Sequence, residues 1–387
     1  MGSEQAGPGR FDLGLSPAQE ERARRLHQES IVVDMLFLGP GGPADFTPEM
    51  NEPLRADYGR SHDAEWTFWL AMTLQARLAV LGRLPAFREW WDTSGVTAGS
   101  RECGIGSFEQ VLREVGRATM QFDGLGWLIK ALRADDIRRA KAEGKHAGIL
   151  HMQDTRAIER DLDRLDLLHD LGMRVVQLTY NGMNFVGAGC TERTDAGLSY
   201  FGVEVVERIN ALRMIVDISH AGRQTTLDAC RVSRAPVLAT HTCAKALSGH
   251  DRAKSDEELR AIAATGGVVG VVVVPPFLSS KPEAAITDFL DHLDYIVRLI
   301  GAEHVGIGTD WPNCAPEWLL RELGEWTARI GFREEHRVDW CAKLQGFRDY
   351  REFINITRGL VARGYSDGGI KAILGGNFLR VFEHICG

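Results

Sequence analysis

The sequence predicts an α/β protein, a (β/α)8 TIM barrel of the kind found in metal-dependent hydrolases. Short runs rich in Val and Ile recur along the chain, and segments with helical spacing separate them. Continuous apolar strands are typical of a parallel sheet buried on both faces, and their alternation with helices is typical of βαβ units. Polar residues follow several of these strands, as expected where functional side chains gather at the carboxyl ends of barrel strands.

The elements follow in order. We expect residues 1–15 to be mobile, and a first helix to begin at Pro17, because Ser16 can cap it and Pro suits the first helical position. Seven strands are predicted, at residues 30–36, 147–152, 174–179, 213–219, 235–240, 266–274 and 303–309. Helices are predicted between them, most clearly at residues 160–173, 201–214 and 288–301.

An eighth strand would have to lie between residues 40 and 146, where the clearest patterns, at residues 65–81 and 107–120, are helical. No tract rich in Ser, Gly or Pro marks a domain boundary. The sequence therefore predicts one barrel domain over residues 16–387, with an insertion around residues 40–140.

The composition favours a small-molecule partner. The net charge of −8 is spread along the chain, which argues against a nucleic-acid or anionic membrane surface. The uncharged run at residues 261–280 is interrupted by Gly and Pro, so we expect a buried strand there and not a membrane span. Seven cysteines without a CxxC pair and an N-terminus without a signal-peptide pattern make the cytoplasm the simplest location.

Three strand ends carry residues that could bind a metal ion. His220 and His241 end successive strands, and Asp310 closes the series. Zinc takes imidazole nitrogen and carboxylate oxygen, and a catalytic site keeps one position for water. A single such histidine is more often structural, but three such residues on strand ends favour a site.

A further strand end with polar residues is "LHMQD", after the predicted strand at residues 147–152. Its His151 and Gln153 point to the same face of the strand. His151 is either a further metal ligand or a packed histidine that hydrogen-bonds to a neighbour. The chain has no GxGxxG turn after its early strands, which excludes a nucleotide site of the Rossmann type.

Several ordered motifs resemble the membrane (renal) dipeptidase family, peptidase family M19 of the amidohydrolase superfamily. They include "LTYNGMNFVGAGCTERTDAGLSYFG", "VDISHAG", "ATHTCAKALSGHDRAKSD", "VGIGTDW" and "GGNFLRVFE". The resemblance covers roughly residues 30–387. It implies a (β/α)8 barrel that holds two zinc ions, hydrolyses dipeptides and forms a homodimer.

The resemblance also implies residue roles. His220 and His241 match the two ligands of one metal, Asp310 matches the carboxylate that handles the water proton, and Arg252 matches the arginine that grips the substrate carboxylate. Tyr180 stands where relatives use a histidine to polarise the scissile carbonyl, so a phenol would donate that hydrogen bond here. Asn184 lies in a Gly-rich loop over the barrel mouth, where binding groups are common.

The chain departs from the family at three metal positions. The family ends its first strand with Asp-Gly-His-x-Asp, whereas the chain has Leu36 and Leu38 at the His and Asp positions. Gln153 replaces the glutamate that bridges both zincs. We therefore expect one zinc ion or none, with His220 and His241 as ligands and Gln153 and His151 as further candidates.

The predicted function is metal-dependent hydrolysis of the amide bond of a dipeptide or a dipeptide-like small molecule. Two alternatives stay open. One is a non-hydrolytic enzyme on the same barrel, performing elimination, isomerisation or tailoring of a carboxylated metabolite. The other is a metal-free binding protein that has lost its reaction.

Overall fold

The barrel is built from one parallel sheet. The computed structural model describes residues 11–281, 283–311 and 314–387. The strand order is β1-β2-β4-β5-β6-β7-β8-β9, and β3 pairs with β4 off this path. The bounds are β1 (Val33–Phe37), β2 (Ala98–Glu102), β3 (Leu128–Lys130), β4 (His146–Met152), β5 (Met173–Gln177), β6 (Ile215–Asp217), β7 (Val237–Thr242), β8 (Val269–Val271) and β9 (Val305–Ile307). All paired neighbours are parallel. The two edges meet where the Asp310 amide donates to the Leu36 carbonyl at 3.2 Å, so the sheet curls into the predicted eight-stranded barrel.

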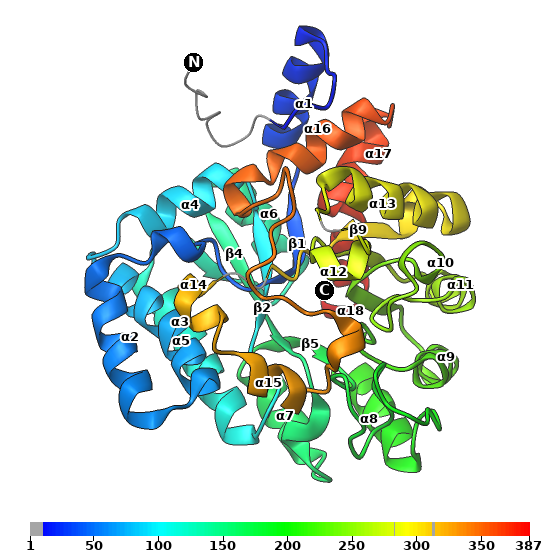
Figure 1. Cartoon of the computed structure of the whole chain (residues 1–387). Coiled ribbons are helices and arrows are strands. Elements are labelled where there is room, and N and C mark those ends of the chain that lie inside the picture. Colours follow the sequence, from blue (N-terminus) through cyan, green and yellow to red (C-terminus); the bar gives the residue numbers. More distant parts are fainter. Residues whose placement is uncertain (1–10, 282, 312–313) are drawn as a thin grey trace.

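Helices surround these strands, as Figure 1 shows. The predicted first helix is confirmed: it begins at Pro17, and the Ser16 hydroxyl accepts a hydrogen bond from the Gln19 amide. The predicted mobility of residues 1–15 concerns mainly residues 1–10, which lie outside the described part of the chain. The helix bounds are α1 (Pro17–Glu29), α2 (Pro48–Ser61), α3 (Ala64–Val80), α4 (Ala86–Ser94), α5 (Phe108–Gly124), α6 (Ala134–Ala142), α7 (Asp163–Asp170), α8 (Tyr200–Ala211), α9 (Arg223–Val232), α10 (Lys245–Ser248), α11 (Asp256–Ala264), α12 (Pro275–Leu278), α13 (Ile286–Ile300), α14 (Glu317–Leu320), α15 (Gly324–Arg329), α16 (Ile354–Ala362), α17 (Asp367–Lys371) and α18 (Asn377–Cys386).

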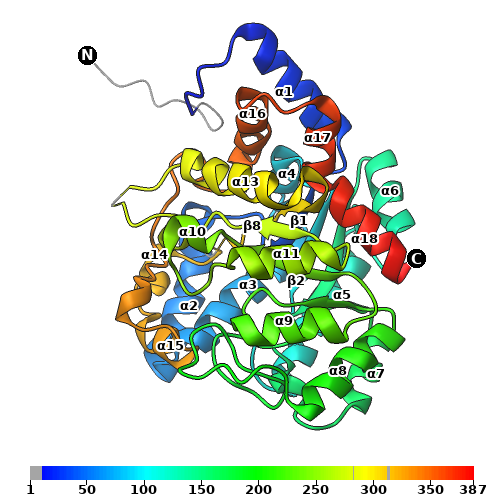
Figure 2. The same ribbon diagram turned by 90° about the vertical axis from the view of Figure 1, so that its right-hand side faces the viewer.

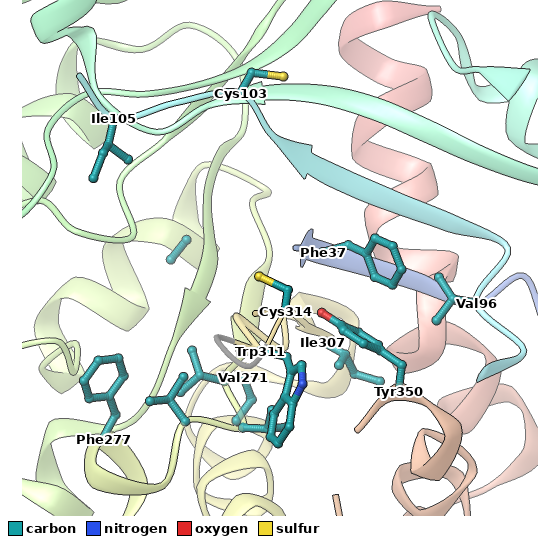
Figure 3. Close-up of a cluster of buried hydrophobic side chains, with 14 of the residues drawn as sticks. Phe37, Val96, Cys103, Ile105, Val271, Phe277, Ile307, Trp311, Cys314 and Tyr350 are labelled. Atoms are coloured by element: carbon teal, nitrogen blue, oxygen red, sulfur yellow. The ribbon is translucent and has the colours of Figure 1, made fainter. Parts of the chain in front are cut away.

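The eighth barrel strand is β2, inside the region expected to be an insertion. Its sequence, Ala-Gly-Ser-Arg-Glu, contains no branched apolar residue, yet all five residues are buried between β1 and β4. A side chain at Gly99 would place its Cβ 2.7 Å from the Phe37 ring, so glycine is what lets that ring lie across the strand. Phe37 also packs against Trp91, with ring centroids 4.4 Å apart. Its other contact is the Tyr350 ring, whose centroid lies 4.5 Å away, and Figure 3 shows Phe37 and Tyr350 side by side.

Helix α18 closes the end of the barrel opposite the carboxyl ends of the strands. Its residues Phe378, Val381 and Phe382 are buried in one apolar cluster with Val33, Ile149 and other strand residues. Figure 2 shows α18 and α6 at one end of the molecule, with α14 and α15 at the other. The barrel is therefore plugged at one end, and any site must open at the other.

The apolar run at residues 261–280 is a buried segment of the barrel, as predicted. It contains β8, and every valine side chain from Val268 to Val273 is fully buried. Within the described ranges, no helix is long and apolar enough to cross a membrane.

His27 on α1 links the stability of this fold to pH. Its Nε2 donates to the Ser94 carbonyl at 3.0 Å, and its Nδ1 accepts from the Thr357 hydroxyl at 2.8 Å. Burial lowers the pKa of His27 from 6.5 to about 4. Between these pH values the unfolded imidazole binds a proton that the folded one does not, so stability is present above pH 6.5 and is lost as pH falls toward 4.

We expect this group to contribute about 3 kcal/mol of stability at pH 7 that is lost by pH 4. Urea unfolding of the wild type and of His27→Gln across this range measures it, because only the wild type carries the contribution of this imidazole. Equal pH dependence in the two proteins would contradict the assignment.

Candidate metal and substrate site

The candidate site is a pocket at the carboxyl ends of the strands. Of the residues predicted from the sequence, it brings together Gln153, Tyr180, His220 and Asp310, which follow β4, β5, β6 and β9. Glu102, the last residue of β2, joins them. The pocket has a volume of about 670 Å³, which includes space open to solvent.

Two imidazoles face each other at this site. The Nε2 atoms of His220 and His241 are 3.0 Å apart. The Asn181 amide donates to the Ile330 carbonyl, which turns its Oδ1 toward His220. Because this oxygen only accepts, the Nδ1 of His220, at 2.7 Å, carries the proton and its Nε2 carries a lone pair.

The same holds for His241. Its Nδ1 lies 2.8 Å from the Thr240 hydroxyl, whose own proton goes to Asp217 Oδ2 at 2.6 Å. Burial opposes ionisation of Asp217, but the nearby His151 and the hydrogen bond from Ser219 prevail and lower the pKa of the carboxyl well below its usual value. Thr240 therefore accepts from Nδ1, and the Nε2 lone pair of His241 faces that of His220.

Two lone pairs that converge at 3.0 Å repel each other unless a cation or a hydrogen-bond donor lies beside them. Burial and the nearby Arg252 charge lower the pKa values of both histidines well below the usual value. Two nitrogens of a tetrahedral zinc site lie roughly 3.3 Å apart, given Zn–N distances of about 2.0–2.1 Å. The donor pair thus fits two positions around one ion, with tautomers fixed by Asn181 and Thr240 as in known metal sites.

Asp310 lies at the mouth with an unusual backbone. Its φ angle is +50°, a left-handed conformation that Asp and Asn adopt more readily than other non-glycine residues. Burial raises the pKa of its carboxyl to about 7, partly offset by the Arg252 charge. At neutral pH such a group can both take and give a proton.

Tyr180 stacks on His220, with ring centroids 4.0 Å apart and an angle of 20° between the planes. Burial raises the pKa of its phenol above the usual value, so the hydroxyl stays protonated and can donate a hydrogen bond. This is the chemistry that the predicted role in polarising a carbonyl requires.

Arg252 is buried and is not one of the residues that line the pocket. Its Nη atoms donate to the carbonyls of Ser219 at 2.5 Å and His241 at 3.1 Å, so it ties together the two segments that carry the histidines. Its Nε has no hydrogen-bond partner among the described residues. Binding of a substrate carboxylate by Arg252 stays a prediction, and Nε is the atom that would serve it.

His151 and Asn184 are held by other groups. The two ring nitrogens of His151 lie 3.2 Å from the Ser100 hydroxyl and 3.1 Å from Asp217 Oδ2, which matches the packed histidine that the sequence left open as one alternative. The Asn184 amide donates to Asp154, Thr155 and Leu178 around its own loop. The ligand role of His151 and the binding role of Asn184 remain predictions.

Comparison with known proteins gives the family. The sequence matches the model of the membrane dipeptidase family (peptidase family M19) over residues 124–321, just over half of the chain. The chain belongs to the membrane dipeptidase family.

Two curated fungal dipeptidases are similar to this chain in sequence. Dipeptidase tcpJ of Claviceps purpurea is 27% identical over 258 residues, 66% of this chain and 55% of that protein. An uncharacterized dipeptidase of Schizosaccharomyces pombe is 36% identical over 186 residues, 46% of this chain and 44% of that protein. The chain thus matches about half the length of these curated relatives.

Solved structures share the whole architecture. An amidohydrolase from Pseudomonas aeruginosa superposes with a TM-score of 0.73 at 27% identity, over 94% of this chain and 98% of that one. The probable dipeptidase PvdM from the same species superposes with a TM-score of 0.69 at 21% identity, over 96% and 99% of the two chains, and shows the fold alone.

The site differs from the two-zinc centre that membership of the membrane dipeptidase family implies. Leu36 is fully buried and Leu38 lines the pocket, and neither side chain can donate a lone pair. Among the residues that the structure describes, no three His, Cys, Asp or Glu side chains are grouped so that they could hold a metal ion. Two donors of the centre that the resemblance implies are therefore missing from this chain.

Three functional residues were not singled out from the sequence. Asp217 could have been found, because an acid inside the apolar run "MIVDIS" must have partners. Asn181 lies beside Tyr180 after the same strand and had no role assigned to it. Glu102 gave no signal, because β2 does not resemble a strand. Burial and the nearby Glu114 raise the pKa of Glu102 to about 8, so a second carboxyl group able to hold a proton lies in the pocket with Asp310.

Proposed function

We propose that the protein is a metal-dependent hydrolase that cleaves the amide bond of a dipeptide-like small molecule, with a single ion. The observation that carries this proposal is the pair of Nε2 lone pairs of His220 and His241 converging at 3.0 Å. Gln153 is the further candidate ligand, through its neutral oxygen. Membership of the membrane dipeptidase family supports the reaction class.

The chain's own residues supply the remaining chemistry. A zinc ion held by the two histidines would lower the pKa of a water molecule to about 7. Asp310 would accept a proton from the attacking water and return one to the leaving amine nitrogen, a double role that suits a carboxyl with a pKa of about 7. Tyr180 donates a hydrogen bond to the oxygen of the scissile carbonyl, and Arg252 Nε binds the substrate carboxylate.

Metal analysis tests the first part of the proposal. We expect gently purified protein to hold about one zinc or manganese ion per chain, and His241→Ala to hold less than a tenth of that amount. His384→Ala, which removes an exposed histidine of α18, is the matched control and should keep the wild-type content.

Turnover on a panel of L,L and L,D dipeptides tests the second part. Cleavage of at least one member by the metal-loaded wild type is expected. Protein that binds no divalent ion, or that binds one and cleaves no dipeptide of the panel, would refute the proposed function.

A further inference from the structure

The walls of the pocket are aromatic. Six side chains from α3, α12 and the segment after α14 line it: Phe68, Trp69, Phe277, Trp326, Phe332 and Trp340. These rings support one another, since Trp326 stacks on Trp340 with centroids 5.4 Å apart and contacts Phe68 at 5.5 Å. The wall is preformed, and it suits a ligand with an apolar or aromatic body.

The charges of the pocket are acidic. Glu102, Asp310 and Asp339 line it, while no Lys or Arg is among its lining residues in the part of the chain that the structure describes. Aromatic faces and carboxylates both attract cations, and the two together are a known means of binding ammonium groups. The part of the pocket that these carboxylates line therefore complements a positive charge.

Glu102 offers a specific acceptor for such a group. It is 5% exposed, and its Oε1 accepts a hydrogen bond from the Gly104 amide. Its Oε2 is buried and has no hydrogen-bond partner among the described residues. A buried acceptor without a partner is costly, so a donor from a ligand or a water molecule is needed there.

A second unpartnered atom lies on the neighbouring strand. The backbone of Gln153 runs beside that of Gly104, with its amide donating to the Gly104 carbonyl at 3.3 Å. The side-chain Nε2 of Gln153 is also buried and without a partner in the described ranges. Glu102 and Gln153 line the same pocket with one open acceptor and one open donor, which are the contacts a ligand with both kinds of group would complete.

Glu102 also lies at an informative position in the barrel. Strand β2 lies between β1 and β4, the strands that carry the leucines and the glutamine in place of the family's metal ligands. On this arc of the mouth, the pocket presents the apolar Leu38, the neutral Gln153 and the acid Glu102. Glu102 is therefore the charged acceptor on this side of the pocket.

We infer that the pocket binds a molecule with an apolar or aromatic body and a protonated amino group, and that this group donates to Glu102 Oε2. The inference rests on the proposed function, in which the ammonium is the free amino end of the dipeptide-like substrate. An ammonium at this oxygen also favours the charged form of a carboxyl that burial would otherwise keep protonated.

Two probes with the same aromatic body and no cleavable amide test this inference: 2-phenylethylamine and 2-phenylethanol. Calorimetric titration of the full chain should show the amine binding about tenfold or more tightly than the alcohol. Glu102→Gln, which keeps the shape, should lower the affinity for the amine about tenfold and leave that for the alcohol unchanged. Glu325→Gln, on the exposed face of α15, is the matched control and should change neither.

An amine that binds the wild type no more tightly than the alcohol would overturn the inference, whether or not the variant folds. Equal loss of amine and alcohol affinity in a folded Glu102→Gln would overturn the role of this carboxyl. The probes are not hydrolysed, so their binding is read independently of catalysis. Hydrolysis without amine preference defeats only this inference, and amine preference without metal or hydrolysis defeats only the proposed function.

Discussion

Asp310→Asn is expected to lower kcat/KM on the best dipeptide substrate by about 10²- to 10⁴-fold, mostly through kcat. The amide keeps the size of the carboxyl and suits the left-handed backbone at this position, where φ is +50°. It cannot take the proton of the attacking water. The expected loss therefore reports proton transfer and not a disturbed fold.

Steady-state kinetics on metal-loaded protein, with thermal unfolding beside it, measures this effect. Asp123→Asn is the matched control, because this exposed carboxyl at the end of α5 does not line the pocket. This variant should leave kcat unchanged. A variant of Asp310 that keeps more than a tenth of the wild-type kcat with its metal content intact would remove Asp310 from the reaction.

Asp217→Ala is expected to destabilise the fold by about 3–5 kcal/mol. Asp217 is fully buried, its two oxygens accept hydrogen bonds from Ser219 and Thr240, and its Oδ2 lies 3.1 Å from His151 Nε2. Removing the carboxylate leaves the imidazole of His151 and both hydroxyls without their acceptor. Because Thr240 also fixes the tautomer of His241, the variant should bind metal more weakly as well.

Urea unfolding of Asp217→Ala, His151→Gln and the double variant measures this coupling. The double variant should lose less stability than the two single losses together, because each residue is the buried partner of the other. A loss below about 1 kcal/mol in Asp217→Ala, or strict additivity in the double variant, would show that the pair contributes little.

The strands that could be predicted are those whose residues carry their own apolar signal. Strands such as β4, β7 and β8 contain Val, Ile or Leu, and all of their residues are buried. Such residues predict a buried strand from the sequence alone. Strand β2 has no such signal. Its Arg101 and Glu102 are buried near Glu114 and Arg117 of helix α5, and this contact between a strand and a distant helix cannot be seen in the strand's own sequence.

The candidate site was predictable to the same depth. The barrel rule places polar residues that follow strands at one mouth, and Gln153, Tyr180, His220 and Asp310 do line one pocket. The rule does not say which neighbours meet. Whether the ring nitrogens of His151 face a metal or Asp217 depends on the side chains of β2 and β6, which no single strand pattern contains.

The left-handed backbone at Asp310 bears on how a library of variants at this position should be interpreted. A screen for folded protein alone will favour Gly and Asn beside Asp, because β-branched and bulky residues resist that conformation. Two separate requirements therefore limit the substitutions that position 310 accepts: the residue must adopt a left-handed backbone, and it must transfer a proton. Only the difference between a selection for folding and a selection for activity isolates the second.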